Sequence, residues 1–174
     1  MRYLGRQYGY YPSDIDEAYE VDSIQDAMVD VSIQFSRIAW ERDQETKLKL
    51  REDLFNGLLS KLISVLNKRL EKNADKGKFL CGEKLTTADF QCAAMIFSKV
   101  YNEAGSDWNE QLQPVFEKHE YLLRYSQTMR EVLAKYLEKD LRGCFDLIIY
   151  GYVKNNIISS FNRVYALRTS VFKC

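Results

Sequence analysis

The stretch KGKFLCGEKLTTADF, at residues 76–90, lies between two helical patterns and is organised like the beginning of a helix. The hydroxyl of Thr86 can accept a hydrogen bond from the backbone N–H of Asp89, and the Asp89 carboxylate can accept one from the backbone N–H of Thr86. Leu85 and Phe90 flank this capping box and are placed to form a hydrophobic staple. Asp89 could also be a catalytic carboxylate, but its position in the first helical turn favours capping. The stretch is therefore expected to start a helix and not to carry chemistry.

Two long amphipathic patterns precede this helix start. Apolar residues recur at steps of three and four from Ile15 to Ile38, which predicts a helix over about residues 14–42 with Ser13 as its N-cap. A second run of the same kind predicts a helix over about residues 45–73. Because the link between them is short and polar, the two helices are expected to run antiparallel.

Helical patterns also continue after residues 76–90. A third helix is predicted from Thr87 to about Glu103, with Gly105 suited to its C-terminal cap. Further helical patterns cover about residues 110–139, where Pro114 marks a start or a kink. The 174-residue chain contains only two prolines and eight glycines, and it shows no convincing strand pattern. The fold class is therefore predicted to be all-α, a helical bundle.

The overall composition excludes several classes of function. The 25 basic and 25 acidic residues balance, so no overall field attracts nucleic acid or anionic membranes. The sequence has no apolar run of about 18 residues and no apolar stretch at its start, which predicts neither a membrane span nor secretion. The four cysteines form no C-x-x-C pair and there is one histidine, so no metal site is expected. Reduced thiols and a cytoplasmic location are the expectation.

The tail at residues 140–174 differs from the rest of the chain. It carries five basic and two acidic residues, a net charge of +3, together with six aromatic residues. A basic aromatic segment can bind nucleic acid through phosphate contacts and stacking. Since no nucleic-acid-binding motif accompanies it, a docked or weakly specified terminal segment is the preferred interpretation. No nucleic-acid partner is predicted.

Two parts of the sequence resemble one family. GKFLCGEKLTTADF resembles the signature of the C-terminal helical domain of glutathione S-transferases, where a capped helix crosses the core. RYLGRQYGYYPSDIDEAYEVDSIQDAMVDV resembles the end of that family's thioredoxin-like domain, the linker and the first helix of the helical domain, nearest to the pi, mu and sigma classes. The resemblance implies that residues 1–12 are the last thioredoxin-domain helix and linker, residues 13–139 the helical domain, and residues 140–174 an atypical tail.

The same resemblance implies two candidate site residues. Asp26 falls where several classes place an acid that reaches across the dimer to the partner's glutathione, although it could simply be a solvated helix carboxylate. Trp40 falls where an aromatic side chain lines the hydrophobic substrate pocket, and it could equally be a core or interface tryptophan. Cys81 and Cys92 have no neighbouring base in the sequence and are expected to be ordinary buried cysteines.

The sequence also departs from the family's catalytic pattern. Glutathione S-transferases bind glutathione in the thioredoxin-like domain, where a Tyr, Ser or Cys activates the thiol. No segment here resembles that site, so no catalytic residue is predicted, and glutathione is expected as a cofactor only if a thioredoxin-like domain completes the chain. Without that domain, an apolar patch at the N-terminus is the candidate partner surface, unless it folds back onto the bundle; its residues are Tyr3, Leu4, Tyr8, Tyr10 and Tyr11.

Three functions are compatible with these observations. The first is a non-catalytic helical module that acts in protein–protein assembly, as a homodimer or with other protein partners. The alternative is the substrate-binding and dimerisation part of an active enzyme that conjugates glutathione to hydrophobic electrophiles. A ligand-binding bundle unrelated to glutathione is supported only by generic helical periodicity.

Overall fold

The computed structural model describes residues 1–102 and 108–137, and the described part of the chain is all-α. The only strand-like pairing in these residues is an isolated antiparallel bridge between Phe79 and Gly82. The predictions for Gly105 and for the tail lie outside the described residues. In chain order the helical elements are α1 (Arg2–Tyr8), α2 (Ile15–Trp40), α3 (Gln44–Leu54), η1 (Phe55–Leu59), α4 (Ser60–Lys72), α5 (Thr87–Met95), η2 (Ile96–Val100), α6 (Asn109–Glu117), α7 (Glu120–Val132) and α8 (Ala134–Leu137).

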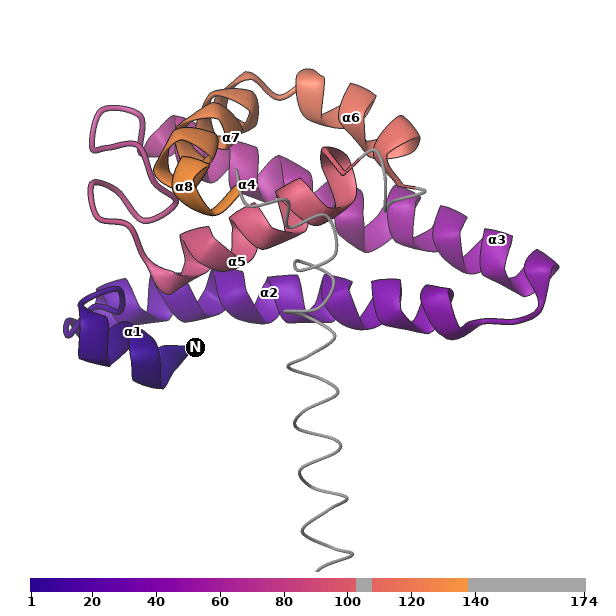
Figure 1. The fold of residues 1–174 in the computed structure, drawn as a ribbon, viewed down its shortest axis with the longest axis horizontal. Coiled ribbons are helices and arrows are strands. Elements are labelled where there is room, and N and C mark those ends of the chain that lie inside the picture. Colours follow the sequence, from indigo (N-terminus) through magenta and orange to yellow (C-terminus); the bar gives the residue numbers. More distant parts are fainter. Residues whose placement is uncertain (103–107, 138–174) are drawn as a thin grey trace, which may run out of the picture.

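Helix α5 lies at the centre of the bundle. In Figure 1, α2 runs along the lower edge, α5 rests on it, and α4, α7 and α8 lie above α5. The α5 residues Ala88, Cys92 and Ala93 have no exposed surface, because small side chains let neighbouring helices approach closely on several sides. The helix that the capped stretch starts is therefore the one around which the core is built.

The predicted antiparallel pair is present, with a local irregularity. Helix α2 is followed after a short turn by a second long helix. The ends of the two helices and the turn between them extend beyond the rest of the bundle on the right of Figure 1. Within this second helix the segment η1, Phe55–Leu59, has π-helical hydrogen bonding, and the Ser60 hydroxyl donates to the carbonyl of Phe55. A π segment inserts an extra residue into the helical register, which the apolar spacing alone does not indicate.

The beginning of α2 corrects the predicted N-cap. Asp14, not Ser13, is the capping residue, and one carboxylate oxygen accepts hydrogen bonds of 3.0 Å from the backbone N–H groups of Asp16 and Glu17. A carboxylate at this position satisfies two donors of the first turn and complements the helix dipole, whereas a serine hydroxyl complements it less strongly.

The helical patterns predicted over residues 110–139 form three helices in the described part of the chain. They break around Lys118–His119 and again at Leu133, giving α6, α7 and α8. Pro114 lies inside α6 and does not start it. Proline lacks the N–H that would bond to the preceding turn, and α6 ends at Glu117, less than one turn beyond it.

Candidate functional site

The carboxylate of Asp89 is enclosed at the beginning of α5. Its oxygens accept hydrogen bonds from the backbone N–H of Leu80 at 2.9 Å and from the backbone N–H and the hydroxyl of Thr86, both at 2.8 Å. The reciprocal contacts of a capping box join Thr86 and Asp89. Asp89 has no exposed surface, so these contacts connect the loop before α5 to the helix inside the core.

A tyrosine from α7 completes the enclosure of this carboxylate. The hydroxyl of Tyr125 donates to the Asp89 carboxylate at 3.1 Å and lies 3.3 Å from its backbone carbonyl. Burial raises the pKa of Asp89, while the hydrogen bonds from Leu80, Thr86 and Tyr125 act in the opposite direction. With its oxygens occupied by these donors and no access to solvent, Asp89 holds α5, α7 and the preceding loop together and does not face a substrate.

The two residues predicted as a hydrophobic staple lie beside this cap. Leu85 and Phe90 are both half-buried against the core. The ring of Phe90 meets the ring of Tyr10 edge to face, with centroids 5.1 Å apart and planes at 89°. An edge-to-face pair of this kind is favourable for aromatic rings, so Phe90 connects the beginning of α5 to the N-terminal segment.

The N-terminal segment is attached to α2 by a second carboxylate network, which is exposed. Nε of Arg2 lies 2.7 Å from the Asp22 carboxylate, and another guanidinium nitrogen of Arg2 lies 3.4 Å from Asp26. The hydroxyl of Tyr11 donates to Asp22 at 3.0 Å. Burial raises the pKa of Asp22, but the hydrogen bonds from Arg2 and Tyr11 and the positive charges of Arg2 and Arg6 together outweigh it and leave the pKa below the ordinary value of 3.8.

Close packing holds the same segment against α5. The backbone N–H of Thr87 donates to the carbonyl of Tyr10 at 2.9 Å, and Gly5 is buried where α1 meets this contact. A Cβ at Gly5 would lie 2.6 Å from Cγ2 of Thr87 and 3.0 Å from Cβ of Tyr11. Only a residue without a side chain fits there, so α1 is packed into the bundle.

Tyr11 does not belong to the exposed patch that the sequence predicted. It is only 8 % exposed, because its ring joins the core and its hydroxyl bonds to Asp22. The other four residues of the predicted patch are exposed: Tyr3 at 79 %, Leu4 at 56 %, Tyr8 at 65 % and Tyr10 at 41 %. Part of the segment folds back onto the bundle, and the rest faces outward.

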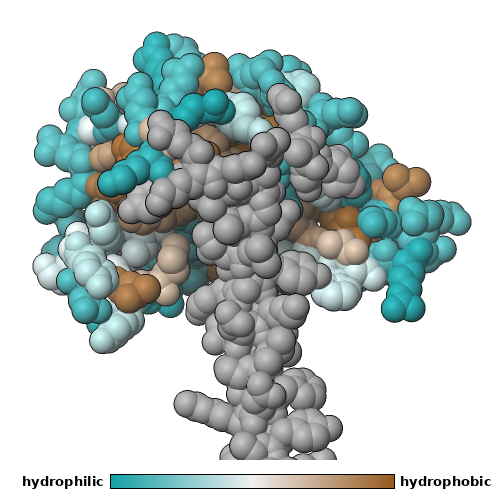
Figure 2. All heavy atoms as spheres, in the orientation of Figure 1, coloured by the Kyte–Doolittle hydropathy of each residue, from teal (hydrophilic) through white to brown (hydrophobic). Residues whose placement is uncertain are grey.

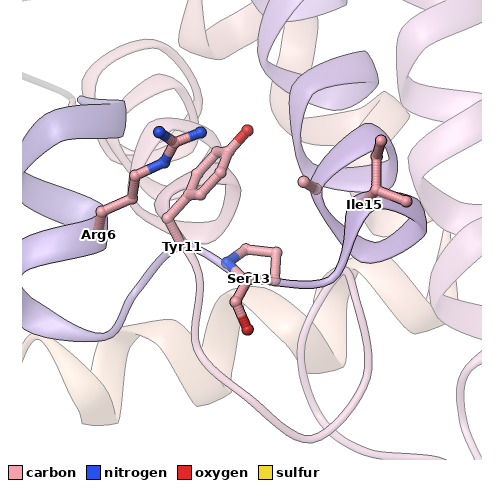
Figure 3. A pocket seen from close by; sticks show the side chains of 6 residues that line it. Arg6, Tyr11, Ser13 and Ile15 are labelled. Carbon is pink, nitrogen blue, oxygen red and sulfur yellow. The ribbon is translucent and has the colours of Figure 1, made fainter.

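An open pocket of about 490 Å³ lies at the junction of α1 and α2. Figure 3 shows the guanidinium of Arg6 beside the Tyr11 ring, which it covers at 5.1 Å from the centroid. Ser13 and Ile15 line the other side of the pocket (Figure 3).

The outward face of α2 carries exposed apolar side chains that continue toward the α2–α3 turn. Val29, Ile33 and Trp40 recur at helical spacing on the face opposite the buried residues, and all three are exposed. Trp40 is 69 % exposed, so it is not a core tryptophan, and its role in a substrate pocket stays a prediction. Figure 2 shows apolar residues as separate brown areas among hydrophilic residues, including areas toward α1 and toward the α2–α3 turn.

Asp26 lies on this same face between the two groups of apolar residues. Its side chain is 73 % exposed and is approached by Arg2. The position leaves the carboxylate accessible from outside the chain, so the predicted contact with a partner's glutathione stays open as a prediction.

The two described cysteines are not activated nucleophiles. Burial and the nearby charge of Asp89 raise the pKa of Cys81 to about 11. Burial likewise raises the pKa of Cys92, which has no exposed surface. Both thiols are free, and both are protonated at neutral pH. Within residues 1–102 and 108–137, no cluster of three or more His, Cys, Asp or Glu residues could hold a metal ion.

The sequence did not single out three side chains of these networks: Tyr125, Arg2 and Asp22. Tyr125 reaches Asp89 across 36 positions in the chain, and Arg2 reaches Asp22 across 20. Partners this far apart leave no periodic signal. The only local indication was the proximity of Arg2 and Arg6 to an acidic helix, which does not specify a pair.

Comparison with known proteins agrees with this architecture. Residues 29–140 match the family model described as glutathione S-transferase, C-terminal domain. The chain is 33 % identical over 118 residues to Glutathione S-transferase 2 of Manduca sexta, covering 67 % of this chain and 56 % of that protein. It is 32 % identical over 96 residues to Glutathione S-transferase 2 of Caenorhabditis elegans, covering 53 % and 50 % of the two chains. The chain thus spans little more than half the length of these relatives.

Two solved structures share the fold. Prostaglandin synthase D of Nilaparvata lugens has a TM-score of 0.64 at 22 % identity, over 80 % of this chain and 65 % of that chain. The glutathione S-transferase Blo t 8 has a TM-score of 0.67 at 19 % identity, over 81 % and 61 % of the two chains. The capped central helix, the all-α bundle and the family match over residues 29–140 lead to one conclusion: this chain belongs to the glutathione S-transferase family and contains its C-terminal helical domain.

Proposed function

We propose that this chain acts as a non-catalytic helical module in protein–protein assembly. The surface proposed to bind the partner is the α1–α2 surface, formed by Tyr3, Leu4 and Tyr8 on α1 and by Val29, Ile33 and Trp40 on α2. The exposure of these six large side chains is the observation that carries the proposal. Exposed apolar groups of this kind, each surrounded by polar residues, can serve as the anchors of a protein interaction site.

The surroundings of this surface favour a partner with apolar and basic groups. Asp26 and Asp30 lie exposed beside Val29 on α2, and no basic residue occurs between Arg6 and Arg37. An acidic rim around apolar anchors steers a basic surface toward the contact and disfavours an acidic one. A homodimer in which α1 of each copy, with Arg2 and Arg6, meets the acidic part of α2 in the other copy is the simplest assembly. A different protein partner with a basic surface is the other form of the same proposal.

The two candidate reactive groups support a structural role for the core. The Asp89 carboxylate is saturated by its four donors, and the cysteine thiols have raised pKa values. Neither group is prepared to act as a general base or a nucleophile at neutral pH.

Sedimentation velocity on the 174-residue chain tests the assembly role. The expected result is a dimer at micromolar concentrations, and a monomer for Ile33→Asp, which places a charge between Val29 and Trp40 on the α2 part of the α1–α2 surface. Glu52→Lys is the matched control, since Glu52 is exposed on α3 and outside this surface. A wild-type monomer that also fails to bind a protein partner would refute the proposal.

The alternative is that this chain is the substrate-binding and dimerisation part of an active glutathione transferase. The exposed positions of Asp26 and Trp40 favour it, because both side chains can be reached by a molecule outside the bundle. In this case the α1–α2 surface would receive a glutathione-binding domain instead of an assembly partner.

Calorimetry with glutathione and a conjugation assay on an aromatic electrophile distinguish the two functions. We expect no binding and no turnover from the purified chain. The assays are then repeated after adding, as a separate polypeptide, the part of the Manduca sexta relative that this chain does not match. Turnover by the chain alone, or turnover restored by that addition and lost with Trp40→Ala, would favour the enzymatic alternative.

We also propose a cytoplasmic location. The free thiols of Cys81 and Cys92 suit a reducing compartment. As a separate finding, none of the helices in residues 1–102 and 108–137 is long and apolar enough to cross a membrane. Fractionation of cells that express the tagged chain tests the location, and recovery in the secreted fraction would contradict it.

A further inference from the structure

The outer face of helix α4 carries a second surface, which differs from the α1–α2 surface in composition and in charge. Its inner face is buried in the core through Leu62, Ile63, Leu66 and Leu70. On its outer face, Lys61, Val65, Lys68 and Lys72 follow one another at steps of four, three and four and are all exposed. We call these residues, with the preceding Leu58, the lysine stripe.

The charge of the lysine stripe is not neutralised within the described part of the chain. None of its three lysines has an ion pair there, whereas the neighbouring Arg69 pairs with Glu20 on α2. Glu71 is the only acidic residue of α4, and it lies about 60–100° around the helix from the lysines, nearest to Lys68, with which it forms no ion pair. The stripe is therefore a row of three positive charges that form no ion pair within the described residues, spanning about 16 Å of helix.

Exposed aliphatic groups alternate with these charges. Val65 is 56 % exposed between Lys61 and Lys68, and Leu58 is 37 % exposed one turn earlier. The outer face thus combines apolar contacts and positive charge at the spacing of a helix seam. A polyanion such as nucleic acid would use the charges only and leave the aliphatic groups without a role.

We propose that the lysine stripe binds an acidic amphipathic helix of a partner protein. Aliphatic side chains of that helix pack against Val65 and Leu58, and its Glu or Asp side chains pair with Lys61, Lys68 and Lys72. The positive charge of the stripe favours an acidic partner over a basic one. The alternation of aliphatic and lysine side chains at helical spacing favours a helix over an extended acidic segment. This proposal does not depend on the α1–α2 surface, so the chain would carry two contact surfaces that select partners of opposite charge.

The test measures fluorescence anisotropy of a labelled peptide against the full 174-residue chain. The probe is a synthetic amphipathic peptide of four heptads with Leu at a and d and Glu at e and g. A second peptide, with Lys in place of Glu, tests charge selection. The stripe variant carries Lys61→Glu, Lys68→Glu and Lys72→Glu. The matched control carries Lys49→Glu, Lys118→Glu and Lys135→Glu, which changes the net charge equally at exposed positions outside α4.

The expected result is binding of the acidic peptide that weakens at least about tenfold in the stripe variant and less than about twofold in the control. Val65→Ser is expected to weaken it by about threefold with the charges intact. Far-UV circular dichroism verifies that the variants stay helical, as expected for exposed substitutions.

Three results of the peptide experiment would overturn the proposal. They are absence of binding at about 100 µM peptide, an equal loss in the stripe and control variants, and no preference for the Glu over the Lys peptide. A tighter, stripe-dependent binding of phosphatidylserine vesicles or duplex DNA would also overturn it, because the occupant would then be a different class of molecule. Ile33→Asp on the α1–α2 surface should leave peptide binding unchanged, which separates this outcome from that of the proposed function.

Discussion

Two carboxylates, Asp89 and Asp22, have similar hydrogen-bond partners and opposite surroundings. Each accepts hydrogen bonds from a tyrosine hydroxyl and from other donors. Asp89 has no exposed surface and joins α5, α7 and the preceding loop, whereas the Asp22 side chain is 31 % exposed and joins α1 to α2. The pKa of Asp89 is raised mainly by burial, and that of Asp22 is lowered because its hydrogen bonds and the nearby arginine charges together outweigh burial. Solvent access, more than the hydrogen-bond partners, distinguishes the Asp89 carboxylate, which stabilises the core, from the Asp22 carboxylate, which attaches α1 to α2.

The largest effect is expected from Asp89→Ala. The substitution leaves buried donors of Leu80, Thr86 and Tyr125 without an acceptor, so the free energy of unfolding should fall by about 3–5 kcal/mol. Urea denaturation measures it, with Asp89→Asn as a control that keeps one acceptor oxygen and should lose less. The half-exposed counterpart Asp22→Ala should lose less, about 1 kcal/mol. Equal losses at the two sites would remove the distinction drawn between them.

The second effect concerns the packing of α1. Gly5→Ala brings a Cβ within 2.6 Å of Thr87 and should lower the free energy of unfolding by about 1–3 kcal/mol. Gly57→Ala is the matched control, because a Cβ there meets nothing within 4 Å and alanine favours helix. The control should be neutral or slightly stabilising in the same denaturation experiment. If Gly5→Ala is equally harmless, α1 is not packed into the bundle as described.

A third effect isolates the cap itself. Thr86→Ala removes the hydroxyl that contacts the Asp89 carboxylate but keeps the backbone donors, so the expected loss is about 1 kcal/mol. Thr46→Ala provides a comparison on α3, where the threonine is an exposed first-turn residue and the cap is Asp43. An unchanged urea midpoint for Thr86→Ala would contradict the importance of the capping box.

The smallest effect is a difference in pH dependence. The pKa of Asp22 is lowered in the folded state, so its contribution to stability is present above the ordinary value of 3.8 and is lost as pH falls through the folded value. Asp89 has the opposite sign, since its pKa is raised: its contribution is present below 3.8 and declines as pH rises through the folded value. The difference in urea midpoint between wild type and Asp22→Asn should therefore shrink on acidification. A difference that grows toward acid pH would show that the Asp22 network does not lower the pKa.

Much of the helical architecture was predictable because it depends on short-range spacing. The apolar steps from Ile15 to Ile38 and the Leu-Thr-Thr-Ala-Asp-Phe start of α5 both operate within a few residues. Local errors arose where two residues competed for one role, as Ser13 and Asp14 did for the N-cap of α2. The π segment, and the positions at which the patterns over residues 110–139 break into α6, α7 and α8, depend on backbone geometry that side-chain periodicity does not report.

The candidate sites were less predictable, because burial depends on contacts between distant parts of the chain. The sequence grouped Tyr11 with Tyr3 and Tyr8 as one aromatic patch, yet Tyr11 packs into the core while the other two face outward. It also offered no means to place Trp40 inside or outside the bundle. Both outcomes follow from where α1 and α2 settle against their neighbours, which no local pattern specifies.

Residue order alone was sufficient for the all-α class, the long antiparallel helices and the capped central helix, since helix periodicity and capping act over one or two turns. The resemblance over those same segments was sufficient for the glutathione S-transferase family. Only the folded chain brought Tyr125 to Asp89 and Arg2 to Asp22, and left the lysine stripe facing outward. These features arise from packing between helices, where exclusion of water converts one carboxylate into part of the core and leaves another as a surface contact.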